Sequence, residues 1–233
     1  MNRICTITVR AGSKGVPGKN WRLIAGLPLF AHSVRHAAEA GIFDRIVVTS
    51  DAPEVLDVAG DHGATDIVVR PLELANDTAG KVPAIVHALL ETERRHHTRF
   101  DTVVDLDATS PLRSIADIRG AVELLETTGA DSVITGSESR RSPYFNLVEL
   151  DSVSGTVAVS KRPGKPVLRR QDVPRTFDMN ASVYAWKRDS LVADPVVFFP
   201  TTRLFEMPES RSHDIDTELD FEFVRWLMEQ RKD

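Results

Sequence analysis

The sequence predicts an α/β fold in which a mostly parallel β-sheet carries helices on both faces and one antiparallel insertion interrupts the pattern. Apolar, strand-like runs alternate with amphipathic, helix-like runs up to residue 135, as expected for successive βα units. The strand-like runs are β-branched enough to be buried on both faces, and right-handed crossovers between them produce a doubly wound sheet. From residue 136 to about 180 the chain changes to short alternating pieces punctuated by prolines, which predicts an antiparallel excursion.

The individual elements follow in order. Strands are expected at residues 4–9, 45–50, 65–69, 102–106 and 132–135, and helices at residues 28–40, 52–61, 80–94 and 115–126. Asp51 is expected to cap the second of these helices, because a carboxylate at that position accepts from unpaired backbone N–H groups. After the insertion, residues 182–186 have the pattern of a core strand and residues 218–228 that of a closing helix.

The composition suits one compact domain over residues 1–233, since 42% of the residues are apolar and 27% are charged. The net charge is −5, but residues 1–38 carry six Lys or Arg and no Asp or Glu, so the remainder carries −11. A nucleic-acid partner is therefore not expected, because such proteins need a broad basic surface. The local excess of cations predicts a small anionic ligand instead.

The only cysteine, Cys5, lies in an apolar strand-like run. A disulfide framework is excluded and a buried thiol is expected, which favours a cytoplasmic location. No basic segment followed by a long apolar stretch opens the sequence, and no apolar run approaches the roughly 20 residues that span a bilayer. No membrane association is expected.

The first predicted strand leads into a loop over residues 10–20 that holds three glycines and three cations. Loops at the carboxyl ends of strands bind ligands in open α/β sheets, and glycines let backbone N–H groups approach anionic oxygens. The spacing matches neither a Walker A loop nor a dinucleotide fingerprint. The loop is therefore interpreted as a phosphate site of another kind, with a solvated basic turn as the alternative.

A second candidate region is acidic. Asp214 and Asp216 flank Ile215, so in extended backbone their carboxylates share one face. Such a pair suits Mg²⁺, which takes one or two carboxylates and completes its shell with phosphate oxygens and water. Helix capping is the competing interpretation, and it accounts for Thr217 and Asp220 but leaves Asp214 unexplained.

A third region, residues 105–113, follows the strand at 102–106 and is expected on the same rim of the sheet. The alternative is an ordinary loop in which Pro111 fixes the backbone and Ser114 or Thr109 caps the next helix.

With these residues in view, the chain resembles the CMP-sialic acid synthetases, the acylneuraminate cytidylyltransferases, over nearly its full length. The resemblance rests on several motifs in order: RAGSKGVPGKN at 10–20, RPLELANDT at 70–78, DATSPLR at 107–113, RRQDVP at 169–174, NASVY at 180–184 and DIDTELD at 214–220. It implies transfer of CMP from CTP to the anomeric hydroxyl of a nine-carbon α-keto acid, with Mg²⁺ and release of pyrophosphate. It also implies a Rossmann-like sheet and a homodimer formed through an inserted arm at residues 137–180 that reaches the acceptor sugar.

The resemblance also implies roles for individual residues. Catalysis would rest on Arg10, Lys19, Asp214 and Asp216, with both aspartates binding the metal. The nucleotide would be held by Arg10, Ala11, Gly12, Ser13, Lys19, Asn20, Arg70, Asp77 and Thr78. The acceptor sugar would meet Asp107, Thr109, Ser110, Arg170, Gln171, Tyr184 and Phe198. Asp107 and Ala108 stand where sialate-specific members carry Gln and Pro, and DLDATSPLR together with SPYFNLVE at 142–149 resembles the legionaminic acid branch.

Three alternatives remain at this point. A ketodeoxyoctonate cytidylyltransferase is disfavoured, because its loop ends in Lys-Pro-Leu whereas Lys19 is followed by Asn20 and Trp21. A non-catalytic nucleotide-binding homologue is possible on fold alone, but both aspartates and both loop cations are retained. A nucleic-acid binder is disfavoured by the acidic balance beyond residue 38.

Overall fold

A seven-stranded sheet forms the centre of the molecule, in the order β11-β7-β10-β6-β1-β4-β5. The computed structural model describes residues 1–12, 15–76, 79–162, 164, 169 and 172–230. The strands of the main sheet are β1 (Arg3–Val9), β4 (Arg45–Ser50), β5 (Asp66–Val69), β6 (Thr102–Leu106), β7 (Ser132–Glu138), β10 (Phe177–Lys187) and β11 (Arg203–Glu206). A short pair, β2 (Leu23–Ile24) and β3 (Leu27–Pro28), lies outside it.

The pairing of the strands is mostly parallel. β1 runs parallel to both β4 and β6, β4 to β5, and β11 to β7. β10 is antiparallel to its two neighbours, β6 and β7, because it returns from the inserted segment in the opposite direction. The predicted α/β class with a mostly parallel sheet is confirmed.

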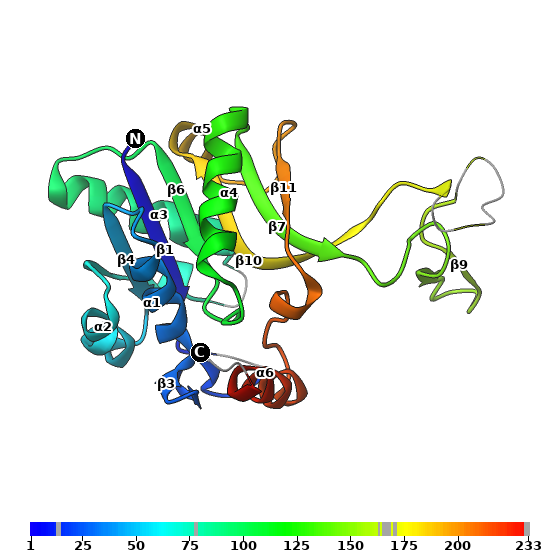
Figure 1. Cartoon of the computed structure of the whole chain (residues 1–233), viewed down its shortest axis with the longest axis horizontal. Coiled ribbons are helices and arrows are strands. Elements are labelled where there is room, and N and C mark those ends of the chain that lie inside the picture. The colour runs from blue at the N-terminus through cyan, green and yellow to red at the C-terminus, as the bar shows by residue number, and fades with distance from the viewer. Residues whose placement is uncertain (13–14, 77–78, 163, 165–168, 170–171, 231–233) are drawn as a thin grey trace.

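Helices cover both faces of the sheet, as Figure 1 shows. They are α1 (Leu29–Ala40), α2 (Pro53–Ala59), α3 (Lys81–His96), α4 (Ile115–Thr128), α5 (Arg188–Ala193) and α6 (Glu218–Gln230). Short 3₁₀ turns lie at Lys19–Trp21, Gly60–His62, Leu72–Leu74 and Glu209–Arg211. None of the helices in the described part of the chain is long and apolar enough to cross a membrane.

Side-chain alternation along β1 divides the core into two layers. Cys5, Ile7 and Val9 are buried with residues of α1, α2 and α4, whereas Ile4 is buried with residues of α3 and α5. Successive strand residues point to opposite faces, so each strand contributes to both layers. Cys5 is a free, fully buried thiol, as expected.

A third, smaller apolar cluster joins the two ends of the chain. Ile215 is fully buried there with Val16 and Leu29 near the start of the chain and with Phe221 and Val224 of α6. Because these residues bury one another, the glycine loop and the acidic segment are packed side by side. Figure 1 shows α6 at the same end of the molecule as β3.

The inserted segment forms an arm that extends away from the main sheet in Figure 1. It contains the antiparallel pair β8 (Val148–Leu150) and β9 (Val157–Val159), so the predicted antiparallel excursion is present. Several of its apolar side chains are exposed, namely Phe145, Leu147, Val148, Leu150, Val153 and Val157.

One local prediction about α2 is wrong. Helix α2 begins after Ala52 with Pro53 in its first turn and no side-chain cap. The Asp51 carboxylate instead accepts from the backbone N–H of Ala11, 2.9 Å away. The carboxylate therefore braces the loop after β1, a tertiary contact that a helix-capping pattern cannot reveal.

Candidate active site

An open cleft of about 370 Å³ lies where β1, β5 and β6 end. Its walls come from the glycine loop, from the segment between β5 and α3, from the loop after β6 and from the acidic segment. The lining residues are Thr8, Arg10, Gly12, Gly15, Lys19, Asn20, Arg70, Leu74, Asn76, Ala79, Gly80, Lys81, Asp107, Ala108, Thr109 and Asp216. The position agrees with the rule that open α/β sheets bind ligands beyond the carboxyl ends of their strands.

The glycine loop is held tightly against the acidic segment. A Cβ atom on Gly15 would lie 2.1 Å from the backbone oxygen of Asp216, so only glycine fits there. Gly18 has a φ of 65°, in the left-handed region that glycine adopts readily. Asn20 is buried and donates from Nδ2 to the Arg10 carbonyl at 3.1 Å. The loop conformation is therefore defined by these glycines and by Asn20.

Cations from two loops line one wall of the cleft. Arg70 is buried and donates from Nη2 to the Thr49 carbonyl at 3.2 Å. Burial lowers the pKa of its guanidinium, and the charge of nearby Arg10 acts in the same direction. Two cations that line one cleft favour an anionic ligand.

The acidic segment adjoins the glycine loop and contributes Asp216 to the cleft lining. The Ile215 N–H donates to the Thr109 carbonyl at 3.0 Å, which joins this segment to the loop after β6. Lys19 Nζ donates to the Ile215 carbonyl at 2.6 Å and lies 3.4 Å from Asp216 Oδ1. Burial raises the pKa of the half-buried Asp214 carboxyl, and the charges of Asp216 and Asp107 raise it further. These carboxylates therefore lie close enough to repel one another.

The capping interpretation of the acidic segment is confirmed for Thr217 and Asp220. Thr217 Oγ1 donates to Asp220 Oδ2 at 2.8 Å, and the Asp220 N–H donates back to Thr217 Oγ1 at 3.2 Å. Asp214 takes no part in these capping contacts.

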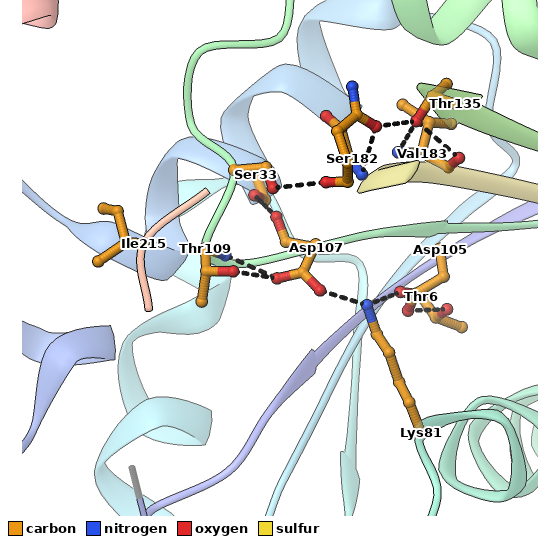
Figure 2. A network of polar contacts seen from close by, with 12 residues as sticks. Thr6, Ser33, Lys81, Asp105, Asp107, Thr109, Thr135, Ser182, Val183 and Ile215 are labelled. Carbon is orange, nitrogen blue, oxygen red and sulfur yellow. Dashed lines mark hydrogen bonds and ion pairs between the residues drawn. The ribbon is translucent and has the colours of Figure 1, made fainter. Parts of the chain in front are cut away.

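Lys81, the first residue of α3, was not singled out from the sequence. Figure 2 shows its amino group between two carboxylates, 2.6 Å from Asp105 Oδ2 and 2.7 Å from Asp107 Oδ2. Asp105 is fully buried, and its other oxygen accepts from Thr6 Oγ1 at 2.8 Å. Asp107 Oδ1 accepts from the Thr109 N–H at 2.8 Å and from Thr109 Oγ1 at 2.7 Å. No local pattern points to this ion triad, because α3 reaches β6 only through the tertiary fold.

Arg113 supports the loop after β6 from beneath. It is almost fully buried and donates to Ser33 Oγ at 2.7 Å, to Ser182 Oγ at 3.0 Å and to the Asp107 carbonyl. Burial lowers the pKa of its guanidinium to about 10. Ser114 and Asp117 then form a reciprocal capping box at the start of α4, one of the two capping options that the sequence offered.

The NASVY motif forms an irregular stretch of β10. Its register against β7 shifts between Met179 and Tyr184, and Ala181 has a φ of 51°. Asn180 Oδ1 accepts from Thr135 Oγ1 at 2.7 Å and from the Ser182 N–H at 3.2 Å. The Asn180 amide thus replaces the strand hydrogen bonds that the bulge interrupts.

The structure brings together eight of the residues predicted from the sequence. Arg10, Gly12, Lys19, Asn20, Arg70, Asp107, Thr109 and Asp216 all line the cleft. Ala11, Ser110, Asp214, Tyr184 and Phe198 are not among the lining residues. Ser13, Asp77, Thr78, Arg170 and Gln171 lie outside the described residues.

Three of the predicted residues that do not line the cleft make contacts with other parts of the protein. The Ala11 N–H donates to Asp51, so this N–H is already engaged. Ser110 is buried, with its hydroxyl 3.5 Å from the Asn180 carbonyl. Tyr184 stacks on Trp186 with ring centroids 5.4 Å apart, and its ring lies 5.2 Å from Lys81 Nζ. Tyr184 therefore packs behind the ion triad.

A cationic glycine loop packed against an acidic segment, at the carboxyl ends of parallel strands, is typical of a nucleotide-binding site suited to phosphoryl-type transfer, which depends on positioning and charge neutralisation. Comparison with known proteins makes the class specific. The family described as Cytidylyltransferase matches residues 4–230. The chain therefore belongs to the cytidylyltransferase family, and the resemblance inferred from the motifs is confirmed.

Individual relatives match over almost the whole chain. CMP-N,N'-diacetyllegionaminic acid synthase of Campylobacter jejuni is 42% identical over 97% of this chain and 94% of its own length. Post-translational flagellin modification protein B of Campylobacter coli is 42% identical over 98% of this chain and 95% of its own length. A solved structure of CMP:2-keto-3-deoxy-manno-octonic acid synthetase complexed with CTP has the same fold, with a TM-score of 0.71, 19% identity and 99% coverage of both chains.

Proposed function

We propose that this cytidylyltransferase transfers CMP from CTP to the anomeric hydroxyl of a nonulosonic acid and releases pyrophosphate, with N,N'-diacetyllegionaminic acid as the preferred acceptor. The choice of acceptor rests on the 42% identity, over 97% of the chain, to a synthase that is named for this sugar. The predicted motif DLDATSPLR points the same way, since it departs from the sialate-specific pattern at Asp107 and Ala108. Sialic acid is the second acceptor to test.

The transfer requires the acceptor oxygen to attack the α-phosphorus while the pyrophosphate departs. Arg10, Lys19 and Arg70 lie along the cleft where they offset phosphate charge. Gly12 and Asn20 shape the nucleotide side of the cleft with them. Preorganised cations stabilise the transition state because they need no reorganisation as negative charge develops.

A divalent metal fits the acidic wall. Asp214 and Asp216 are hard oxygen donors. Burial raises the pKa of the Asp214 carboxyl, and repulsion from Asp216 and Asp107 raises it further, a repulsion that a bound cation relieves. The described residues include no group of three or more His, Cys, Asp or Glu side chains arranged to hold a metal. We propose that Asp214 and Asp216 hold Mg²⁺, which supplies charge neutralisation at the phosphates.

The acceptor side of the site is proposed from the remaining residues. Asp107, Thr109, Ser110, Arg170, Gln171, Tyr184 and Phe198 are assigned to it by the family resemblance. The arm at residues 137–180 is proposed to form a homodimer, in which it reaches the partner's acceptor pocket. The exposed apolar side chains of the arm support this proposal, as does its length, since long insertions in compact domains usually have a function. The cytoplasmic location stays a prediction.

The test is pyrophosphate release from each of the four nucleoside triphosphates with a panel of acceptors. The panel contains N,N'-diacetyllegionaminic acid, N-acetylneuraminic acid and 2-keto-3-deoxyoctonic acid. We expect turnover with CTP alone and the highest kcat/KM with the diacetamido acid. A preference for 2-keto-3-deoxyoctonic acid would favour the rival enzyme, and no turnover with any pair would favour the non-catalytic homologue.

A further inference from the structure

Lys81 is held at the cleft wall by two carboxylates that follow one another on the same strand end. Its Nζ lies 2.6 Å from Asp105 Oδ2 and 2.7 Å from Asp107 Oδ2, as Figure 2 shows. An ammonium group has three N–H donors. Two of them are directed to carboxylates, and the side chain lines the cleft. Lys81 therefore has a fixed direction and one further N–H to offer.

The position of Lys81 in its helix is electrostatically unfavourable for a cation. It is the first residue of α3, and no acidic residue lies in the first turn of that helix. The helix dipole disfavours a cation at an amino terminus. A residue that contradicts its local environment and is held in place by tertiary contacts marks a functional position.

The paired carboxylate of Asp107 has little capacity left for a substrate. Its Oδ1 accepts two hydrogen bonds from Thr109, and its Oδ2 accepts from Lys81. These contacts lower the pKa of Asp107, and the two carboxylates raise the pKa of Lys81, so the pair stays ionised near neutral pH. Three of the roughly four acceptor sites of the Asp107 carboxylate are therefore occupied within the protein, and Lys81 is the group of this pair that offers a donor to a substrate.

The charge around Lys81 indicates whether it suits a neutral or an anionic substrate oxygen. Lys81 and Asp107 form a neutral ion pair, and the buried Asp105 adds no positive charge, whereas a triphosphate is attracted by the separate cations Arg10 and Arg70. A donor with no net positive charge around it suits a neutral oxygen, such as the carbonyl of an acetamido group, better than an anionic one. Thr109 and Tyr184, both proposed for the acceptor side, adjoin the triad.

We propose that Lys81 is a specificity-determining residue that donates a hydrogen bond to an acetamido carbonyl of the acceptor sugar, with Asp105 and Asp107 fixing its direction. The inference rests on the proposed function. On this proposal Lys81, and not Asp107, is the group that recognises the sugar, and Asp107 holds the ammonium group in position.

The test compares the parent enzyme with Lys81→Met on two acceptors, N,N'-diacetyllegionaminic acid and a nonulosonic acid whose acetamido groups are hydroxyls. We expect kcat/KM for the diacetamido acid to fall about tenfold or more, as for loss of a charged hydrogen bond. The ratio of the two kcat/KM values should fall with it, while the KM for CTP stays within about twofold. Lys187→Met is the matched control, since Lys187 ends β10 and donates to the Gly129 carbonyl.

A second variant separates recognition from folding. Lys81→Met leaves two close carboxyl groups without their cation, whereas Lys81→Met/Asp105→Asn keeps only the Asp107 carboxylate and still lacks the donor. The double variant should fold and show the same loss of acceptor discrimination. An unchanged ratio in the double variant, or a rise in the KM for CTP alone, would overturn the inference. An inactive parent would refute the proposed function itself.

Discussion

Lys19 donates a hydrogen bond from Nζ to the carbonyl oxygen of Ile215, 2.6 Å away and 196 residues later in the chain. The contact joins the cationic glycine loop directly to the Asp-Ile-Asp segment. Cationic and acidic side chains therefore lie next to each other at one cleft, where Lys19 Nζ is also 3.4 Å from Asp216 Oδ1.

Lys19→Ala should impair both nucleotide binding and turnover, because the lost cation offsets charge in the bound triphosphate and additional charge on the departing pyrophosphate. We expect the KM for CTP to rise and kcat to fall, each by about tenfold, which is about 1.4 kcal/mol. Initial rates of pyrophosphate release over a CTP series measure both constants, with Lys187→Ala as the control. If both constants stayed within about twofold, the loop would be a basic turn only.

Asp216→Asn and Asp214→Asn preserve shape but remove one negative charge each. We expect kcat to fall by about 100-fold or more, or about 2.7 kcal/mol, and the Mg²⁺ concentration for half-maximal rate to rise. Turnover over a Mg²⁺ series, with circular dichroism to check the fold, measures this effect. Asp216→Asn with parental activity at limiting Mg²⁺ would remove the metal assignment.

The neighbouring Asp220 offers a matched control for the metal experiment. Its carboxylate accepts from the Thr217 N–H at 2.7 Å and so caps α6. Asp220→Asn should lower the free energy of unfolding by about 1 kcal/mol or less, while its Mg²⁺ dependence stays parental. A shift of the Mg²⁺ dependence in this variant would extend the metal site to Asp220.

The sequence could predict the elements whose signals are local. Alternating apolar runs located most strands, and the pair Thr217 and Asp220 located the start of α6. Those features depend on composition and short-range spacing, and both can be recognised in a single sequence.

The remaining features depend on contacts between distant elements. Lys81 meets Asp105 and Asp107 only because the first residue of α3 lies against the carboxyl end of β6. Asp51 resembles a helix cap in sequence but braces Ala11 in the structure. In both cases the partner comes from another element, and the local pattern contains no information about that element.

The pairing of Asp117 with Arg211 predicts a pH-dependent contribution to stability. Arg211 Nε and Nη2 each lie 2.8 Å from an oxygen of the nearly buried Asp117 carboxylate. Asp117→Asn should lower the free energy of unfolding at pH 7 by about 2 kcal/mol, because Arg211, whose side chain is 32% exposed, loses its charged hydrogen-bond partner. Urea unfolding measures this difference, and Glu222→Gln, in an exposed pair with Arg225, should change it by less than about 1 kcal/mol.

The sign of the pH effect follows from the lowered pKa of the Asp117 carboxyl, to which the hydrogen bonds from Arg211 and Ser114 contribute. The pair stabilises the fold fully above the unfolded-state pKa of about 3.9. Its contribution is lost as the pH falls through the lower folded-state pKa. The difference between the parent and Asp117→Asn should therefore shrink below about pH 4, and a difference that persisted unchanged to pH 2 would contradict the assignment.

The arm predicts a homodimer. An isolated two-stranded sheet is marginally stable in water, yet β8 and β9 pair with Leu150 opposite Val157, and both side chains are about two-thirds exposed, at 67% and 64%. A second copy related by a two-fold axis would bury them. Light scattering at micromolar concentration should give twice the chain mass of 25.8 kDa for the parent, and the single mass for Leu150→Asp/Val157→Asp. Leu90→Asp, an exposed position on α3, should stay dimeric, and a fully active monomeric parent would refute the dimer.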